Sequence, residues 1–375
     1  MWSLFLFDTT SGRLGRQLPL PALSWTRTIG DSTILGGGQG SQGAKLTFPV
    51  GVFDVEGQRP HPVDLHSTLM PVERGVVLMW ADRPWVAGLI GDRSDSREEI
   101  AFPVESLTSS VLSRRLASPD LTDGLATSTR GWSGLGRGTL VKRVVQAGLE
   151  RGGLPITFDE DEAGPHSLTV AGYDLANARV SDLIRKISHE DGGPDVDLRP
   201  YLTGDGTLAW HLYTGRDAYP HIRQVTVHAI TEGMLLDLRQ VVSGAQVAHR
   251  VYGTGSGTGE GTLLSRIQDL DAVRGGWPLM ETVASDTSAD TQAQVDAVAA
   301  AHLAAHKAPL QQWEATINAG GPIPPTTIWP GDLVTLDVAG FPTIEDGRYQ
   351  VRVMEMSGDT SELVRLKFDA TPAIY

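Results

Sequence analysis

Residues 75–90 read GVVLMWADRPWVAGLI, and this stretch sets the fold class. Two apolar runs, Gly75–Trp80 and Trp85–Ile90, flank the turn-forming sequence Ala81-Asp82-Arg83-Pro84. Apolar runs of this length that are separated by a short turn are typical of a β-hairpin. The N-terminal part of the chain is therefore expected to consist of β-strands.

Further strands are predicted on both sides of this hairpin. Leu23–Ile29 and Ala44–Val50 alternate apolar with polar residues, which is the period of a half-buried strand. Glu99–Val104 follows a turn at residues 91–96. Because short strands at this spacing favour a small barrel or sandwich, we predict an N-terminal β-barrel over residues 1–104.

The middle of the chain has a helical period instead. Its apolar residues recur on one face in three segments: Val104, Leu107, Val111, Leu112 and Leu116; Leu140, Val141, Val144, Val145 and Leu149; Val180, Leu183, Ile184 and Ile187. Asn177 is a plausible N-cap of the third helix, and Gly192-Gly193 a plausible stop. Strands return at Leu208–Tyr213 and Gln224–His228. Residues 105–230 are therefore predicted to form a mixed α+β insert.

The rest of the chain is predicted to return to β structure. Residues 231–284 are expected to form a connecting β and loop segment, in which the glycine-rich Gly253–Gly261 is a flexible loop. Residues 285–375 are expected to form an alanine-rich helix and a C-terminal β-barrel. The predicted elements there are a helix from about Thr287 to His306, capped by Ser285 or Asp286 and ended by Pro309, and strands at Leu333–Val338, Tyr349–Met354 and Glu362–Phe368. The predicted fold class is thus α+β and β-rich, with a small β-barrel at each end of the chain and a mixed α/β insert between them.

Composition limits the classes of function. The 375 residues, 40% of them hydrophobic, are enough for two or three packed units. There are no cysteines, which excludes disulfides, thiolate metal sites and cysteine nucleophiles. The apolar start is too short for a signal peptide, and no apolar run approaches the ~18 residues of a membrane span, so we expect a protein made in the cytoplasm. A net charge of −14 argues against a dedicated nucleic-acid binder. An acidic protein would, however, suit the wall of a channel that DNA must slide past without binding.

Motifs for phosphate and metal binding fail on spacing. The glycines of Gly253–Gly261 do not match a dinucleotide-binding loop. A calcium loop that begins at Asp159 lacks ligands at Ala163 and Val170, so a solvated acidic loop is expected there, and the same interpretation applies to Asp195 and Asp197. The remaining candidates are histidines: His61 and His66 with Asp64 in a proline-flanked loop; His189 in an incomplete metalloprotease motif with Gly193 at the second histidine position; and His211, His221 and His228 near strands.

Signatures of hydrolysis are equally weak. No serine lies between glycines at the spacing of a nucleophile elbow. Tryptophans could stack on sugars, but most of them lie in alternating strands, where core packing explains them: Trp80, Trp85, Trp210, Trp313 and Trp329. We therefore predict no catalytic, cofactor-binding or metal-ligating residues, and a protein that is not an enzyme.

Three passages together resemble the hub proteins of phage tails. They are Trp85–Leu107, a strand, a turn, a strand and a helix; Val180–Ile187 followed by Asp205–Trp210; and Pro330–Leu336 with Gly347–Val353. The order of elements is similar to that of the family of the myophage baseplate hub and the siphophage tail-associated protein. It also resembles the minor tail proteins of phages that infect actinobacteria.

This resemblance implies a structural virion protein at the tail tip, without cofactors, that takes part in host cell entry. In the family, the two barrels are tube-like and three subunits form a pseudo-sixfold ring below the tail tube, so the resemblance implies two small tube-like β-barrels that flank the mixed α/β insert. The implied partners are further copies in a homotrimeric ring, the distal tail protein, the tape measure protein and receptor-binding proteins. Phage DNA would pass the lumen without specific binding, and the chain would not insert into a membrane. Because the chain stops at Tyr375, an appended lysin is not expected.

Two other functions stay open. A host-carbohydrate-binding receptor module would bind cells through an exposed tryptophan. A tail-associated cell-wall hydrolase would cleave peptidoglycan with two carboxylates on opposite sides of a cleft, and the sequence alone does not show which acidic residues would form that pair.

Overall fold

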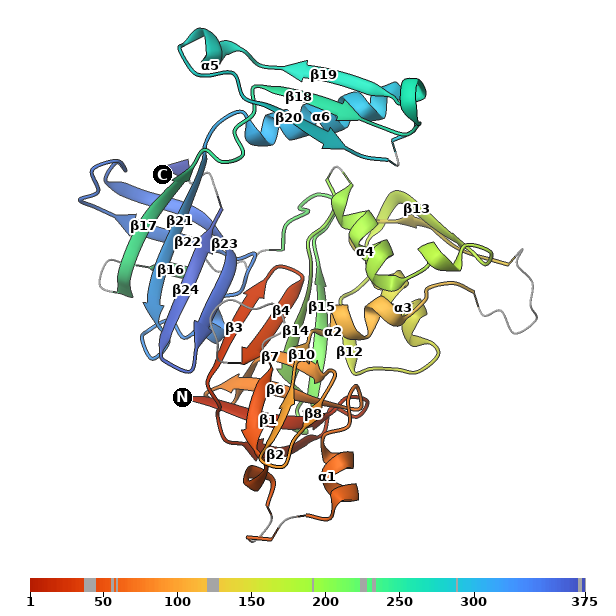
Figure 1. The fold of residues 1–375 in the computed structure, drawn as a ribbon, viewed down its shortest axis with the longest axis vertical. Helices are drawn as coiled ribbons and strands as arrows, with labels where there is room; N and C mark the ends of the chain where they lie inside the picture. The colour runs from red at the N-terminus through yellow and green to blue at the C-terminus, as the bar shows by residue number, and fades with distance from the viewer. Residues whose placement is uncertain are drawn as a thin grey trace. The chain divides into compact units, whose positions relative to one another are not determined.

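The computed structural model describes residues 1–36, 45–54, 57–58, 60–119, 128–190, 192–222, 228–230, 234–287, 289–369 and 373–374. The chain divides into two compact units. The first consists of Met1–Asp237, Ala315–Phe368 and Ala373–Tyr375, and the second of Leu238–Glu314 with Asp369–Pro372. The first unit therefore combines both ends of the chain, drawn in red and in blue in Figure 1.

The predicted hairpin is confirmed. Strands β6 (Arg74–Trp80) and β7 (Arg83–Ile90) pair antiparallel, and β1 (Trp2–Asp8) pairs with the other side of β6. The turn uses positive φ angles at Ala81 and Asp82, of 45° and 63°. Almost every residue of β6 and β7 is buried, because both faces of this hairpin are covered. This explains why their sequences are continuous apolar runs rather than alternating ones.

The two ends of the chain join in one sheet. Strand β23 (Gly347–Asp359) pairs through its first half with β22 (Leu333–Val338), and through its second half with both β24 (Leu363–Phe368) and β3 (Leu23–Thr28). From β3 the sheet continues through β4, β10, β7, β6 and β1 to β2. Among the described strands, the pairings form an open path and close neither end into a barrel. The β-rich α+β class is confirmed, whereas the two barrels are not.

Shorter elements complete the N-terminal part and the edges of the sheet. They are β2 (Leu14–Leu18), β4 (Asp31–Gly36), β5 (Leu46–Pro49), α1 (Pro62–Thr68), β8 (Ser94–Asp95), β9 (Glu99–Phe102), β10 (Val104–Glu105), β16 (His228–Ile230) and β25 (Ala373–Ile374). The predicted strand at 224–228 falls mostly on residues 224–227, which lie outside the described part of the chain.

Helices α3 (Arg137–Leu149) and α4 (Val180–His189) lie where the periodicity predicted them. Their apolar residues enter one core, which also holds Trp210 and Leu212. The predicted helix at 104–116 is wrong in length, since only α2 (Leu107–Ser110) and a following 3-10 turn form. Asn177 is also not a cap: it lies in a 3-10 turn, and its amide donates to Asp174. Strands β11 (Thr129–Leu135) and β13 (Ala163–Ala171), which pair antiparallel, were not predicted.

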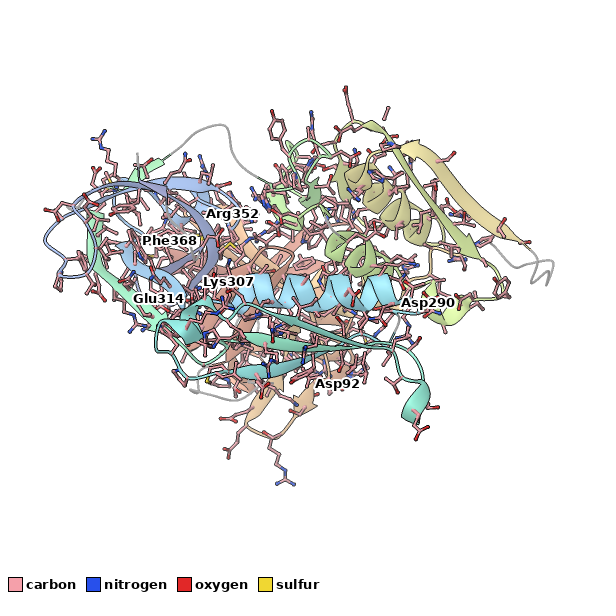
Figure 2. The ribbon with its side chains drawn as sticks, turned by 90° about the horizontal axis from the view of Figure 1, so that it is seen from above. Asp92, Asp290, Lys307, Glu314, Arg352 and Phe368 are labelled. Atoms are coloured by element: carbon pink, nitrogen blue, oxygen red, sulfur yellow. The ribbon has the colours of Figure 1, made fainter. Side chains whose placement is uncertain are left out.

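The second unit packs one helix on one face of a three-stranded sheet. Its elements are β18 (Arg250–Thr254), β19 (Leu264–Gln268), α5 (Asp271–Arg274), β20 (Glu281–Ser285) and α6 (Gln292–His306). Figure 2 shows α6 between the labelled Asp290 and Lys307. Buried Val295, Ala299 and Leu303 place an apolar stripe of α6 on the sheet. The chain passes from the first unit to the second within β17 (Leu235–Ser243), and it returns to the first unit within β21 (Leu310–Asn318).

The glycine-rich stretch is more ordered than its composition predicts. Gly253 belongs to β18, and Gly259–Gly261 form a 3-10 turn. A Cβ at Gly253 would lie 2.9 Å from the carbonyl oxygen of Val295, so glycine lets α6 approach the sheet closely. The prediction of a loop is therefore wrong at Gly253. Of the helices within the described residues, none is both apolar and long enough for a membrane span.

Candidate functional site

A small sheet in the first unit has two faces of different chemistry. It consists of β12 (Ile156–Phe158), β15 (Leu208–Thr214) and β14 (Val196–Leu202), in that order. Because side chains alternate along a strand, Trp210 and Leu212 point into the core on one face. His211 and Tyr213 take the other face, where Arg199 lies opposite His211 in the strand register. The second face therefore gathers polar and aromatic groups.

Two arginines share one buried carboxylate beside this face. The Asp197 carboxylate accepts from Arg199 Nε at 2.9 Å and from Arg27 Nη2 at 3.4 Å. Arg27 is fully buried and also donates to the carbonyl oxygen of Trp85 at 2.7 Å. Burial lowers the pKa of Arg27 to about 10, although Asp197 favours its charged form. The cluster joins β3, from the start of the chain, to β14.

Trp329 extends this cluster to the C-terminal part. Its ring lies 4.2 Å from the guanidinium carbon of Arg27 and 5.0 Å from that of Arg199, and it packs on Trp85 at 4.7 Å between ring centroids. Arg199 also donates from Nη2 to the carbonyl oxygen of Pro330 at 3.1 Å. Such cation–π contacts strengthen when the cation is desolvated, as both guanidiniums are here. Three distant parts of the sequence are thus held at one point.

An open pocket lies on the same face of the small sheet. Its volume is about 450 Å³, and its lining consists of Thr157, Arg199, Pro200, Tyr201, His211, Tyr213 and Trp329. The Tyr213 ring lies 4.8 Å from the guanidinium carbon of Arg199 and 4.4 Å from the His211 ring. Thr157 Oγ1 and His211 Nδ1 are 2.8 Å apart, while His211 Nε2 lies 3.1 Å from Asp159. The polar groups around the pocket are therefore held in place by their neighbours.

Asp195 and Asp197 were predicted to lie on a solvated turn, and this is wrong. Asp197 is 2% exposed and pairs with two arginines. Asp195 forms an ion pair with Arg352 of β23 and accepts from the backbone N–H of Ile222 at 2.9 Å. His221 Nδ1 also lies 3.5 Å from the Asp195 carboxylate. A usable signal was present, because residues 196–202 alternate apolar and polar side chains as a strand does.

The acidic loop that begins at Asp159 is anchored by basic residues. The ammonium group of Lys142, which is 3% exposed, donates to the carbonyl oxygens of Asp159, at 3.1 Å, and of Glu160. Burial lowers the pKa of Lys142. Arg143 pairs with Asp161 on the same loop. The loop is therefore part of the fold around α3, and not simply a solvated segment.

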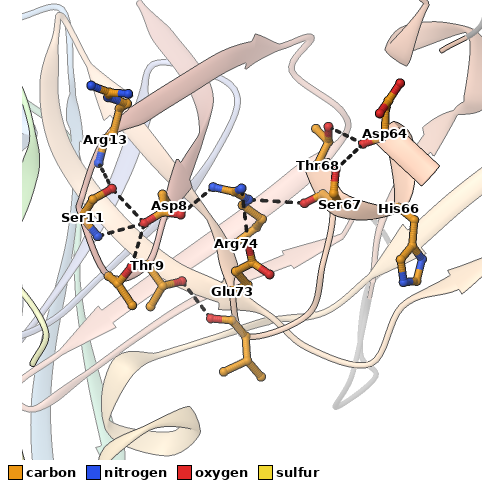
Figure 3. Close-up of polar contacts among 12 residues, drawn as sticks. Asp8, Thr9, Ser11, Arg13, Asp64, His66, Ser67, Thr68, Glu73 and Arg74 are labelled. Carbon is orange, nitrogen blue, oxygen red and sulfur yellow. Dashed lines mark hydrogen bonds and ion pairs between the residues drawn. The ribbon is translucent and has the colours of Figure 1, made fainter. Parts of the chain in front are cut away.

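The side chains of the candidate metal ligands His61, Asp64 and His66 do not point toward one common site. His61 caps α1, since its Nδ1 accepts from the backbone N–H of Val63 at 3.3 Å. The His66 Nδ1 lies 2.9 Å from Arg93 Nη2, and Figure 3 shows its ring pointing away from the Asp64 carboxylate. Within the described ranges, no group of three or more histidine and acidic side chains is placed to hold a metal ion.

The remaining candidates have structural positions. His189 is the last residue of α4. His228 is in β16, but the structure does not describe its side chain. Core packing is confirmed for Trp80, Trp85, Trp210 and Trp313, which are all at most 5% exposed. Trp329 differs because it is only partly buried and lines the pocket.

Solved structures of other proteins share this fold. The 43 kDa tail protein of prophage MuSo2 from Shewanella oneidensis matches with a TM-score of 0.54 and 9% identity, over 98% of each chain. A chain of the PdpA–VgrG complex of Francisella matches with a TM-score of 0.51 and 7% identity, over 100% of this chain and 59% of that one. No protein-family model and no curated protein matches the sequence. The predicted resemblance to phage tail proteins is thereby confirmed at the level of the fold.

Proposed function

We propose that this chain is a structural protein of a phage-type tail, located at the tail tip in the hub that joins the tail tube to the tip. The observation that carries the proposal is the fold, which matches the MuSo2 tail protein over 98% of both chains. Since one fold can host several functions, the physical features of the chain must also suit this role. In this proposal the protein is made in the host cytoplasm and acts in host cell entry.

The proposed assembly is a homotrimeric ring. Closed symmetric rings are common among soluble homo-oligomers. The large sheet ends at β2, whose outer side pairs with no described strand, so its backbone groups are available to a neighbouring subunit. In the ring, residues 1–104 and the strands that follow the helix within residues 285–375 would curve into tube-like barrels, giving six similar units from three copies. The divisions at residues 104, 230 and 284 stay predictions.

The lumen and partners belong to the same proposal. The net charge of −14 supports a channel that phage DNA passes without specific binding, because like charges repel. The proposed neighbours are the distal tail protein, the tape measure protein and receptor-binding proteins of the tip. The proposal contains no catalytic step, cofactor or membrane insertion.

Mass measurement and imaging test the proposal. Native mass spectrometry of the purified chain over a concentration series should give a trimer. Labelled antibodies against the chain should bind one end of the tail in electron micrographs of the particle. A chain that remains monomeric at every concentration would contradict the ring, and labelling along the whole tube or on the capsid would contradict the location.

A carbohydrate-binding role is the second candidate, and the aromatic pocket favours it. It does not exclude a structural role, because a hub subunit can carry a binding site.

A further inference from the structure

We propose that the pocket on the outer face of the β12–β15–β14 sheet binds a neutral pyranose unit of a polysaccharide. The inference rests on the second candidate function, carbohydrate binding, which it deepens by naming the site and the class of ligand, and it does not depend on the proposed tail role. It starts from the shape of the pocket: about 450 Å³, within the ordinary range for sites that take one small ligand.

The pocket walls provide an aromatic platform. Tyr213 is 36% exposed, so part of its ring is open to solvent, and Trp329 is partly buried beside it. Both rings are fixed by contacts with the Arg199 guanidinium. A pyranose has an apolar C–H face and a rim of hydroxyls, and aromatic rings bury such a face while their polar edges stay available. Rings that are already fixed lose little freedom when a ligand binds.

The rim provides donors and acceptors without partners. Among the described residues, the Tyr213 hydroxyl and Arg199 Nη1 have no hydrogen-bond partner, although the Arg199 side chain is only 8% exposed. Asp197 and Pro330 hold the other nitrogens of Arg199 in place. Thr157, His211 and Tyr201 also line the opening, but their polar atoms already bond to one another or to Asp159. The Tyr213 hydroxyl and Arg199 Nη1 are therefore the groups that can bond to sugar hydroxyls.

The charges favour a neutral ligand over an anion. Arg199 already shares the Asp197 carboxylate, and Asp159 lies 3.1 Å from His211. An added carboxylate or phosphate would therefore face two carboxylates near the cations. An apolar peptide side chain also fits poorly, because six of the seven lining residues carry polar side-chain atoms that it would leave unpaired.

Binding by the full chain is the test. Methyl glycosides of hexoses, N-acetylhexosamines and 6-deoxyhexoses would be offered one at a time at millimolar concentration, with saturation-transfer NMR as the readout. We expect at least one to bind and Tyr213→Ala to weaken its binding by about tenfold, the effect of losing one ring contact. Tyr213→Phe, which keeps the ring but removes the hydroxyl, should have a smaller effect.

Tyr173→Ala is the matched control. Tyr173 is 77% exposed and does not line the pocket, so its replacement should leave binding unchanged. Circular dichroism of each variant verifies that the fold is retained. Three results would each overturn the proposal: no binding by the unaltered protein to any glycoside, equal binding by Tyr213→Ala, or preferential binding of an uronate over its neutral parent sugar. None of these results bears on the ring, so failure of the binding site and failure of the tail role are distinguishable.

Discussion

Trp25 lies directly opposite Gly358 in the pairing of β3 with β23, and its indole fills the space that a side chain at position 358 would need. The ring atom Cζ2 is 2.7 Å from the position of a Cβ at Gly358, and the Leu363 carbonyl oxygen is 3.0 Å from it. This contact is where the start and the end of the chain meet in one sheet. Its tightness makes the junction sensitive to a single methyl group.

Gly358→Ala should therefore destabilise the first unit. A buried indole against backbone cannot move freely, and overpacking of this kind costs about 1–3 kcal/mol. Urea unfolding followed by tryptophan fluorescence measures the change, because all tryptophans except Trp277 and Trp313 are in the first unit. Gly204→Ala is the control, since a Cβ there would meet nothing within 4 Å. Equal stability of the two variants would mean that the junction is looser than described.

Asp197→Asn should be more damaging, because it leaves the buried guanidiniums of both Arg27 and Arg199 without their shared counterion. Removing one partner of a buried ion pair costs about 3–5 kcal/mol. Adding Arg27→Met should recover part of this loss, since one of the two unpaired charges is then gone while that of Arg199 stays. The control is Asp182→Asn, whose partner Arg185 is 64% exposed, and here a change below about 0.5 kcal/mol is expected in the same unfolding measurement. A small effect of Asp197→Asn would show that Arg27 does not need this carboxylate.

Sequence patterns predicted the elements whose signals are local. The hairpin of β6 and β7 and the helices α3 and α4 each show their period and turn within a few residues. The β3–β23 pairing joins residues more than 300 positions apart, and no local pattern records it. Each end of the chain was therefore predicted to close on itself.

The site was missed for a related reason. Asp197 and Arg199 stand two positions apart on β14, and their alternation with apolar neighbours indicates a strand. However, their burial depends on Arg27 and Trp329, which come from both ends of the chain. The sequence shows which side chains share a strand face, but not what covers that face.

Thr291→Ala should destabilise α6 by about 1 kcal/mol. Thr291 and Gln294 form a capping box, in which each side chain bonds to the backbone of the other, so the helix begins at Gln292 rather than near residue 287. Hydrogen exchange of the first-turn amides of α6 should accelerate in this variant. Ser285→Ala tests the cap that was predicted from sequence. Ser285 is in β20, so Ser285→Ala should leave the exchange rates at the start of α6 unchanged. If exchange there is faster in Ser285→Ala and not in Thr291→Ala, the result would support a helix that begins near residue 287.

Asp8→Asn should change how the stability of the first unit depends on pH. The pKa of Asp8 is lowered to about 2, chiefly by the hydrogen bond from the Ser11 backbone N–H, while burial opposes this shift. The Ser11 hydroxyl and Arg74, both shown in Figure 3, lower the pKa further, as does the Thr10 hydroxyl. Because the folded-state pKa lies below the ordinary value, the charged carboxylate stabilises the fold. Its contribution is complete above about pH 5 and is lost as the pH falls through 2.

At neutral pH the asparagine variant should therefore be less stable than the unaltered protein by up to about 2 kcal/mol, and the difference should shrink toward zero below about pH 2. Urea unfolding at several pH values measures this difference. Glu73→Gln is the matched control, because Glu73 pairs with the same Arg74 at 3.4 Å but is 54% exposed. Its effect should be below about 0.5 kcal/mol at every pH. A stability difference for Asp8→Asn that does not vary with pH would mean that the Ser11 and Thr10 bonds do not depend on the charge of Asp8.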